Sequence, residues 1–452
     1  MRRSRAVDAL RGAAVLLVLL HHTDFGTVLT SSKYLRPIHE LQAVGYLGVS
    51  LFLVISGFSI HLRFAAGGRF TARRFLWRRW LRLHPPYYVA LLFTACTYAG
   101  EHTWPRASWG LADGPMPLAV LIAVHLAVLP TTVLPPAWLS VTWSLGLEEH
   151  LYLGYAAVHR WLRRTNPMIW LLATLALCLG WRLGSQLLVP TVPKSFHPLV
   201  DESTWMGTLL FQQAPARVAE WVLGAVIAEW YLGNVRLPRL ASHWTTAVAS
   251  CGLTWYLVRH HLYRMSVVGH PFYLSDLLFD LVAGIAFAAV LGTCLDHEMR
   301  RPEREDSWPR LVWVGERSYS LYLVHLPVLV LSYHLINPLL DGSVARLIEV
   351  ALAWPAALGG GALLFRYVEM PAARWSKRAG RQSAATLPRP REGQENANAA
   401  ANAAHTNTAH TNAAAAVGPG SVTAGAGAGA GAASRDRRGN REAAAEPELV
   451  TP

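Results

Sequence analysis

The sequence has few charged residues for its length. Only 15% of the 452 residues are Asp, Glu, Lys or Arg, whereas 52% are hydrophobic. This composition leaves too little polar surface to cover a soluble globule of that size, and a lipid bilayer is the natural solvent for such a chain. The sequence therefore predicts an all-α integral membrane protein.

The sequence also has few cysteines. Cys96, Cys178, Cys251 and Cys294 lie within or beside apolar segments, and none belongs to a CxxC pair. This pattern argues against a disulfide framework and against a zinc site, and no other cluster requires a metal. No small-residue cleavage site follows the first apolar run, so we expect that run to be a retained span and not a signal peptide.

Acidic residues are outnumbered, and the net charge is +13. The arginines stand in clusters between apolar runs, which is typical of membrane topology and not of a nucleic-acid footprint. No nucleic-acid partner is therefore expected.

What is abundant is apolar runs of near-bilayer length. A further run at 118–129 is shorter and ends in Pro130, so we expect it to be re-entrant or interfacial. About ten transmembrane helices are predicted, at 12–29, 45–64, 85–101, 143–159, 168–188, 214–232, 243–259, 273–294, 313–335 and 344–367.

Ten spans return both termini to one side of the membrane. With the N-terminus inside, the inner connections hold most of the arginines, including the clusters at 63–82 and 300–310. This bias predicts a multi-pass protein of the cell (inner or plasma) membrane with both termini cytoplasmic. Residues 1–378 form the predicted transmembrane domain. Residues 379–452 are rich in Ala, Asn and Gly, cannot bury a core, and are predicted to be a disordered tail.

Two ionisable residues stand on one face of the first span. Arg11 and His22 are eleven residues apart, which is close to three helical turns and about 16 Å along the axis. Ionisable groups inside a membrane are usually kept for function, and histidine can remove a hydroxyl proton near neutral pH. The alternative is a snorkelling arginine and a histidine that bonds a neighbouring helix.

An arginine cluster precedes the third span. The string RRFLWRRWLRLHPPYY places Arg79 and Arg82 at helical spacing with Arg74 and Arg78. Guanidinium groups bind phosphate oxygens in pairs, so the cluster could hold the phosphates of acyl-coenzyme A. The alternative is a positive-inside anchor that contacts lipid headgroups.

Two later spans carry polar faces. In WLSVTWSLGLEEHLYL, Ser144 and Glu148 share a face, and Glu148 could accept the second ring proton of His22 or pair with an arginine as a structural carboxylate. In GERSYSLYLVHLPVLVL, Tyr322 and His325 share a face with Ser318. This row could line the path of an acceptor or form a helix-packing network.

The order and wording of these stretches resemble the acyltransferase 3 family across about residues 5–375. The resemblance runs through seven collinear stretches: the Arg11-x10-His22 spacing, residues 48–58, Arg79 and Arg82 with Pro85 and Tyr87, Ser144 with Glu148, Arg217 to Ala225, residues 318–327 and residues 365–375.

This resemblance implies a membrane O-acyltransferase. Such an enzyme moves an acyl group, with acetyl the expected one, from acyl-coenzyme A to a hydroxyl of a sugar, polysaccharide, glycolipid or natural product. Acyl-coenzyme A is then a donor substrate, and no bound cofactor is expected. His22 resembles the catalytic base, with Arg11 its motif partner, and Glu148 resembles a catalytic-site carboxylate. Arg79 and Arg82 resemble donor-side residues.

The sequence departs from the family pattern in two places. His150 stands where similar proteins commonly have glutamine. The extracytoplasmic SGNH-type hydrolase domain of some relatives is absent from the sequence, so transfer is expected to finish in the membrane domain or on a separate partner. A transporter or flippase of an amphiphilic substrate is the rival interpretation, which inverted repeats with interrupted helices would favour.

Overall fold

The computed structural model is built almost wholly from helices. It describes residues 4–99, 141–188, 213–259, 264–267, 270–300 and 308–385, apart from gaps at 26–27, 30–32, 69, 337 and 340–341, and three isolated positions between 123 and 127. The chain divides into a first unit, Met1–Ala385, and a second unit, Thr386–Pro452, which lies outside the described residues. The division predicted at 378 and the disorder of the tail therefore stay predictions.

Each of the ten predicted spans coincides with helical structure. The α-helices are α1 (Arg5–His22), α2 (Arg36–Ala43), α3 (Gly48–Ala65), α4 (Ala72–Ala99), α6 (Thr142–Leu162), α7 (Pro167–Leu188), α9 (Ala214–Tyr231), α10 (Trp244–Arg259), α11 (Leu274–Arg300), α12 (Pro309–Glu316), α13 (Ser318–Ile336), α14 (Gly342–Leu364) and α15 (Met370–Ala385). Short 3₁₀ turns cover Gly45–Leu47 and Arg239–Ser242, and a π-helical turn covers Phe365–Glu369.

Within the described residues, five helical segments are long and apolar enough to cross a membrane: Gly45–Ala65, Pro167–Ser185, Leu278–Arg300, Ser318–Ile336 and Gly342–Arg378. The helical class of the fold is thus confirmed, and the total of ten spans stays a prediction. The run predicted to be re-entrant, 118–129, lies almost entirely outside the described residues.

One short hairpin interrupts the helical chain. Strands β1 (Arg264–Val267) and β2 (His270–Tyr273) pair antiparallel, with Val267 opposite His270. The hairpin lies almost wholly in the connection between the predicted spans 243–259 and 273–294, and no strand had been predicted there.

The first helix begins and ends seven residues earlier than predicted, at Arg5 instead of 12 and at His22 instead of 29. Its polar N-terminus is helical because it is capped. The hydroxyl of Ser4 accepts a hydrogen bond from Val7 N, and Glu298 of α11 accepts from Ser4 Oγ at 2.6 Å and from the first backbone amides of the helix. A cap supplied by a distant helix is invisible to hydropathy.

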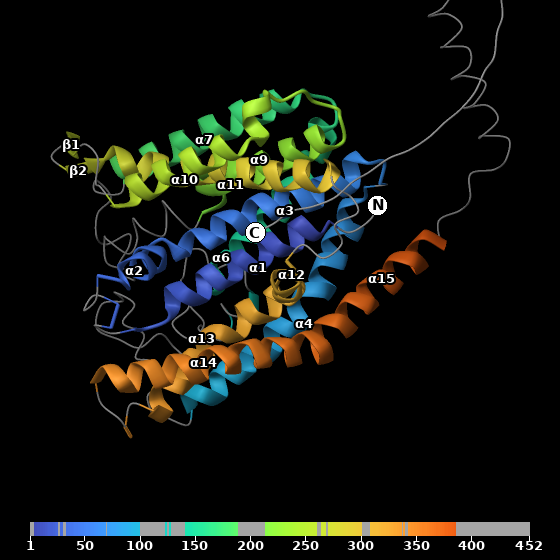
Figure 1. The fold of residues 1–452 in the computed structure, drawn as a ribbon. Coiled ribbons are helices and arrows are strands. Elements are labelled where there is room, and N and C mark those ends of the chain that lie inside the picture. The colour runs from blue at the N-terminus through green and yellow to red at the C-terminus, as the bar shows by residue number, and fades with distance from the viewer. Residues whose placement is uncertain are drawn as a thin grey trace, which may run out of the picture. The chain divides into compact units, whose positions relative to one another are not determined.

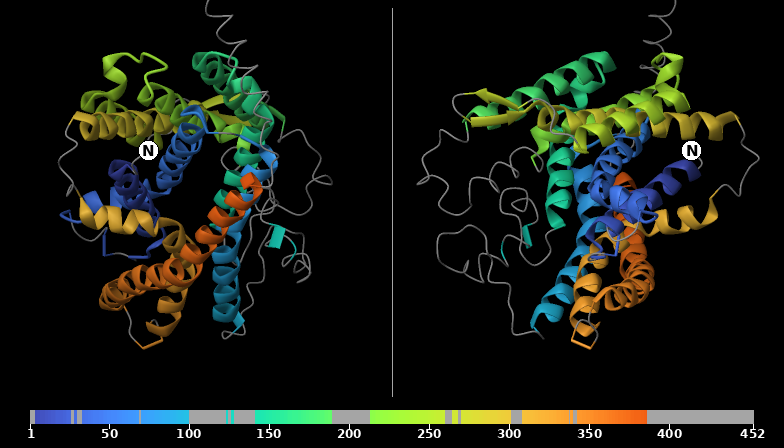
Figure 2. Two further views of the ribbon diagram at one scale, coloured as in Figure 1. Left: turned by 90° about the vertical axis from the view of Figure 1, so that its right-hand side faces the viewer. Right: turned by 60° about the vertical axis from the view of Figure 1, so that its left-hand side comes forward.

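The helices form two groups with α1 and α3 between them (Figure 1). Helices α7, α9, α10 and α11 lie on one side, and α4, α13, α14 and α15 lie on the other, as the two further views in Figure 2 also show. Helix α3 packs chiefly on α9, and α1 packs on α12, α3 and α13. Helix α1 therefore carries Arg11 and His22 along the middle of the first unit.

Glycines allow the two central helices to approach their neighbours closely. A Cβ atom on Gly57 of α3 would lie 1.8 Å from Trp221 O of α9, and one on Gly315 of α12 would lie 1.7 Å from Asp8 O of α1. Only glycine fits at these crossings. The second crossing fixes α12 beside the turn of α1 that carries Arg11.

A buried ion network joins α7, α9 and α11 of the first group to the central helix α3. Arg182 of α7 pairs with Asp280 of α11, and Arg217 of α9 pairs with Glu220 at 2.7 Å and with Asp280 at 3.6 Å. Arg217 also donates to Ser50 Oγ of α3 at 2.9 Å. The four charged side chains are at most 4% exposed and their formal charges sum to zero, as burial of ions demands.

Candidate active site

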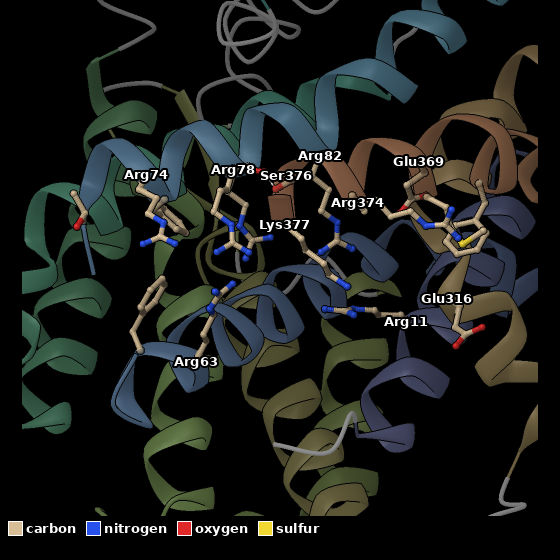
Figure 3. Close-up of a pocket in the computed structure, with 17 residues that line it drawn as sticks. Arg11, Arg63, Arg74, Arg78, Arg82, Glu316, Glu369, Arg374, Ser376 and Lys377 are labelled. Atoms are coloured by element: carbon tan, nitrogen blue, oxygen red, sulfur yellow. Dashed lines mark hydrogen bonds between the residues drawn. The ribbon is translucent and has the colours of Figure 1, made fainter. Parts of the chain in front are cut away.

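A basic cup of about 690 Å³ opens between α4, α15, α3 and α1. Figure 3 shows the arginines of α4 facing Arg63 and Arg11 across the cavity, with Lys377 of α15 beside them. Two carboxylates, Glu316 and Glu369, also line it. Its cationic lining residues are Arg11, Arg63, Arg74, Arg78, Arg79, Arg82, Arg374 and Lys377.

Eight cations against two carboxylates leave the cup strongly positive. Burial, together with the neighbouring charges of Arg63, Arg74 and Arg79, lowers the pKa of Arg78 below its ordinary value. A bound polyanion would offset the repulsion between these positive charges. Guanidinium groups also match the geometry of phosphate oxygens. The cup is therefore suited to a ligand that carries several phosphates.

A second cavity, the inner chamber, has a volume of about 330 Å³. It shares six lining residues with the basic cup: Arg11, Arg63, Arg79, Arg82, Glu316 and Glu369. The two cavities are therefore continuous. Half of the other residues of the chamber are apolar, and among its polar residues are Ser56, Ser144, Glu148 and Tyr322. A ligand with a polyanionic head in the cup can thus extend a slender arm into the chamber.

Three predicted residues meet in the wall of the inner chamber. Glu148 accepts a hydrogen bond from Ser56 Oγ of α3 at 2.7 Å. The hydroxyls of Ser144 and Tyr322 lie 2.5 Å apart, and that of Tyr322 also donates to Val141 O at 3.0 Å. These bonds join α3, α6 and α13 around the chamber.

Arg11 lies where the two cavities join. Its guanidinium donates to Ser59 Oγ at 3.0 Å and pairs with the buried Asp8 at 3.5 Å. The structure therefore brings Arg11 together with Arg79 and Arg82, which come from a separate stretch of the sequence.

His22 and His325 lie beyond Tyr322. The rings of Tyr322 and His325 are 5.6 Å apart, and those of His325 and His22 are 5.1 Å apart in a T-shaped arrangement. His22 is half-buried and His325 is fully buried. The two imidazoles thus lie on the far side of Tyr322 from the inner chamber, at the end of α1 opposite to Arg11.

The expected bond between Glu148 and His22 is absent from the described residues. Glu148 is engaged by Ser56, whereas Nδ1 of His22 is bonded to Val18 O at 2.9 Å. His22 is the last residue of α1, and α1 contacts α3 and α13 in the bundle more than it contacts α6. That hypothesis about Glu148 was therefore wrong in its geometry, and Glu148 instead belongs to the wall of the chamber.

Sequence reasoning missed several residues of the site. Glu369 is 3% exposed, accepts a bond from Ser320 Oγ at 2.6 Å and lines both cavities. It ends the π-helical turn, a local feature often found at functional sites. Arg374 and Lys377 follow on α15. The signal for Glu369 and Arg374 was the stretch 365–375, to which no role had been assigned, and no signal pointed to Lys377.

Metal ligation has no support in the described part of the chain, where no group of three or more His, Cys, Asp or Glu side chains could hold an ion. The two cavities offer basic, carboxylate and hydroxyl groups, whereas the imidazoles of His22 and His325 line neither of them.

Comparison with known proteins decides the family. The sequence profile of a family described as an acyltransferase domain matches residues 4–366. This chain belongs to the acyltransferase 3 family. The match includes every site residue predicted from the sequence, whereas Glu369, Arg374 and Lys377 lie beyond its end. Membership confirms that the chain is an acyltransferase enzyme, against the transporter interpretation.

Two acyltransferase relatives illustrate the range of the family. The chain is 27% identical over 404 residues to the acyltransferase MdmB of Streptomyces mycarofaciens, covering 86% of this chain and 96% of that protein. It is 24% identical over 382 residues to the peptidoglycan O-acetyltransferase OatA of Listeria monocytogenes, covering 81% of this chain. The chain spans about 55% of the length of OatA. No solved structure matches the chain.

Proposed function

We propose that this acyltransferase moves an acyl group, with acetyl the expected one, from acyl-coenzyme A to a hydroxyl of a sugar, polysaccharide, glycolipid or natural product. The observation that carries the proposal is the continuity of the basic cup with the inner chamber. The cup fits the phosphates of coenzyme A, and the chamber fits its thioester arm. The name of OatA supports an O-linked acetyl product on a carbohydrate.

The acceptor approaches from the His22 end of α1. Arg11 faces the cup and His22 ends the helix three turns further on. Under the positive-inside rule, the cup with its eight cations lies on the cytoplasmic side, where acyl-coenzyme A is found. This supports a protein of the cell membrane with both termini in the cytoplasm.

His22 acts as the general base in this proposal. Because Nδ1 is bonded to Val18 O, Nε2 is the nitrogen that can take a proton. The hydroxyl oxygen of the acceptor attacks the thioester carbonyl carbon while its proton passes to His22. The C–S bond then breaks, and the leaving thiolate of coenzyme A receives the proton from His22. An ester remains on the acceptor. Ser144, Glu148 and Tyr322 line the chamber along the acyl group.

The test is release of free coenzyme A from acetyl-coenzyme A by the purified full-length protein, with a panel of sugar, glycolipid and macrolide acceptors. We expect acceptor-dependent release by the wild type and a loss of about a hundredfold or more in His22→Ala, the scale of a lost general base. His21→Ala is the matched control. His21 is the adjacent histidine, and its Nδ1 bonds Gln42 O at 3.0 Å.

Equal activity in the wild type and in His22→Ala would remove His22 from the mechanism. No release with any acceptor or any acyl-coenzyme A would overturn the proposed reaction itself.

A further inference from the structure

The imidazole of His325 carries a buried nitrogen that has no hydrogen-bond partner among the described residues. Its side chain is fully buried, and its Nε2 makes no hydrogen bond in the described part of the chain. Buried polar atoms in folded proteins are nearly always bonded, because an unpaired one loses its water without compensation. An exception beside the proposed base therefore calls for a functional explanation.

The hydrogen bonds of the two histidines fix which ring nitrogens carry protons. Nδ1 of His325 lies 2.6 Å from Tyr322 O, and Nδ1 of His22 lies 2.9 Å from Val18 O. A main-chain carbonyl only accepts, so in both rings Nδ1 is the donor and Nε2 holds a lone pair. Both neutral imidazoles are thus held in the tautomer whose Nε2 is an acceptor.

The neighbouring ring of His325 is that of His22, with centroids 5.1 Å apart. The two rings meet edge to face, so the ring of His325 lies directly beside that of the proposed base. An imidazolium formed on His22 would lie in a water-poor region where charge–dipole interactions are strong.

The charged groups in this region are engaged elsewhere. Glu148 is bonded to Ser56, and Glu149 pairs with His84 at 3.2 Å. On the helix that packs against α13, Glu349 pairs with Arg346, which also contacts Asp24. His21 on α1 bonds Gln42 O, and the hydroxyl of Tyr322 is taken by Ser144 and Val141. No carboxylate is hydrogen-bonded to His22 among the described residues.

We propose that His325 is a positioning residue for the base, and that its neutral Nε2 stabilises the imidazolium that His22 becomes when it takes the acceptor's proton. His325 neither gains nor loses a proton in this step. Its lone pair acts on the imidazolium as a nearby dipole, since Nδ1 of His22 is already bonded to Val18 O. The inference rests on the proposed function, in which His22 is the base.

The test compares His325→Leu with His325→Gln in the full-length protein. Leucine removes the polar atom, whereas the amide of glutamine can place an acceptor near the former Nε2. We expect His325→Leu to lower kcat about tenfold or more with the KM for acetyl-coenzyme A unchanged. Its Tm should equal or exceed that of the wild type, because an unpaired polar atom leaves the core. His325→Gln should retain more kcat than His325→Leu.

A merely structural histidine would give different results. Wild-type kcat in His325→Leu, or equal losses of kcat and Tm in both variants, would overturn the inference. Should His325→Leu fail to fold, His325→Met is judged by the same criteria. Activity in the wild type that is lost in His22→Ala but kept in His325→Leu would overturn this inference alone. A wild type without acyl transfer would overturn the proposed function and this inference with it.

Discussion

Arg79 and Arg82 differ from the other arginines of α4 because they line both cavities, whereas Arg74 and Arg78 line the basic cup alone. The guanidinium of Arg79 also lies 5.1 Å from the centre of the Tyr152 ring, which holds it at the entrance of the chamber. On the proposed function, this pair lies nearest to the part of coenzyme A that joins its phosphates to the thioester arm.

Replacing Arg79 by Ala should therefore raise the KM for acetyl-coenzyme A by about tenfold, the scale of one lost charge-assisted hydrogen bond. Steady-state kinetics with varied donor at fixed acceptor measure this change. Arg300→Ala is the control, since Arg300 is an exposed arginine that pairs with Asp296 at the end of α11. Equal changes in the two variants would show that general positive charge, and not the cup, binds the donor.

At the scale of elements, α15 contributes to the site through one face. Arg374 and Lys377 line the basic cup, whereas Arg378, equally exposed on the same helix, does not. The π-helical turn between α14 and α15 sets this orientation, because it shifts the register of the helix just before Met370. Helix α15 packs along α4, so its cations lie beside those of α4 in the cup.

The double variant Arg374→Glu, Lys377→Glu should raise the KM for acetyl-coenzyme A by about tenfold or more, with little change in Tm because both side chains are exposed. The increase should shrink at high salt, since exposed charges are screened. Arg378→Glu is the matched control and should change KM less than about twofold. A similar rise in KM for the control would contradict a role for this particular face.

The helices were predictable from the sequence where a run of neighbouring apolar residues defines them. A transmembrane helix needs about twenty predominantly apolar residues, and every predicted span overlaps at least one helix. The ends of α1 were wrong because Glu298, far along the chain, caps its first turn. Residue sets on one helix, such as Ser144 with Glu148, were placed correctly on one wall. The hydrogen-bond partner of Glu148 was not predicted correctly. The relative register of α1, α3 and α6 is set by tertiary packing such as the Gly57 crossing.

At the scale of the whole molecule, stability depends on the buried ion network of α7, α9 and α11. Arg182 is fully buried and paired with Asp280, while Arg217 contacts both acids of the network. Removal of one partner leaves an uncompensated charge away from water, which is far more costly than removal of a matched pair.

Arg182→Met should destabilise the fold by about 3–5 kcal/mol, the scale of a broken buried ion pair. The double variant Arg182→Met, Asp280→Leu should recover much of that loss, because one positive and one negative charge remain. Thermal unfolding in detergent of the two single variants and the double variant measures the coupling. Strictly additive effects would mean that the two side chains do not stabilise each other.

Helix α1 acts as a spacer of fixed length. The cap from Glu298 and the glycine crossing with α12 hold it in place, with Arg11 in the basic cup and His22 at the other end. On the proposed function, donor and acceptor then stay on opposite sides of the bilayer throughout the reaction. Neither coenzyme A nor the acceptor has to cross the membrane, and only the few atoms of the acyl group make the passage.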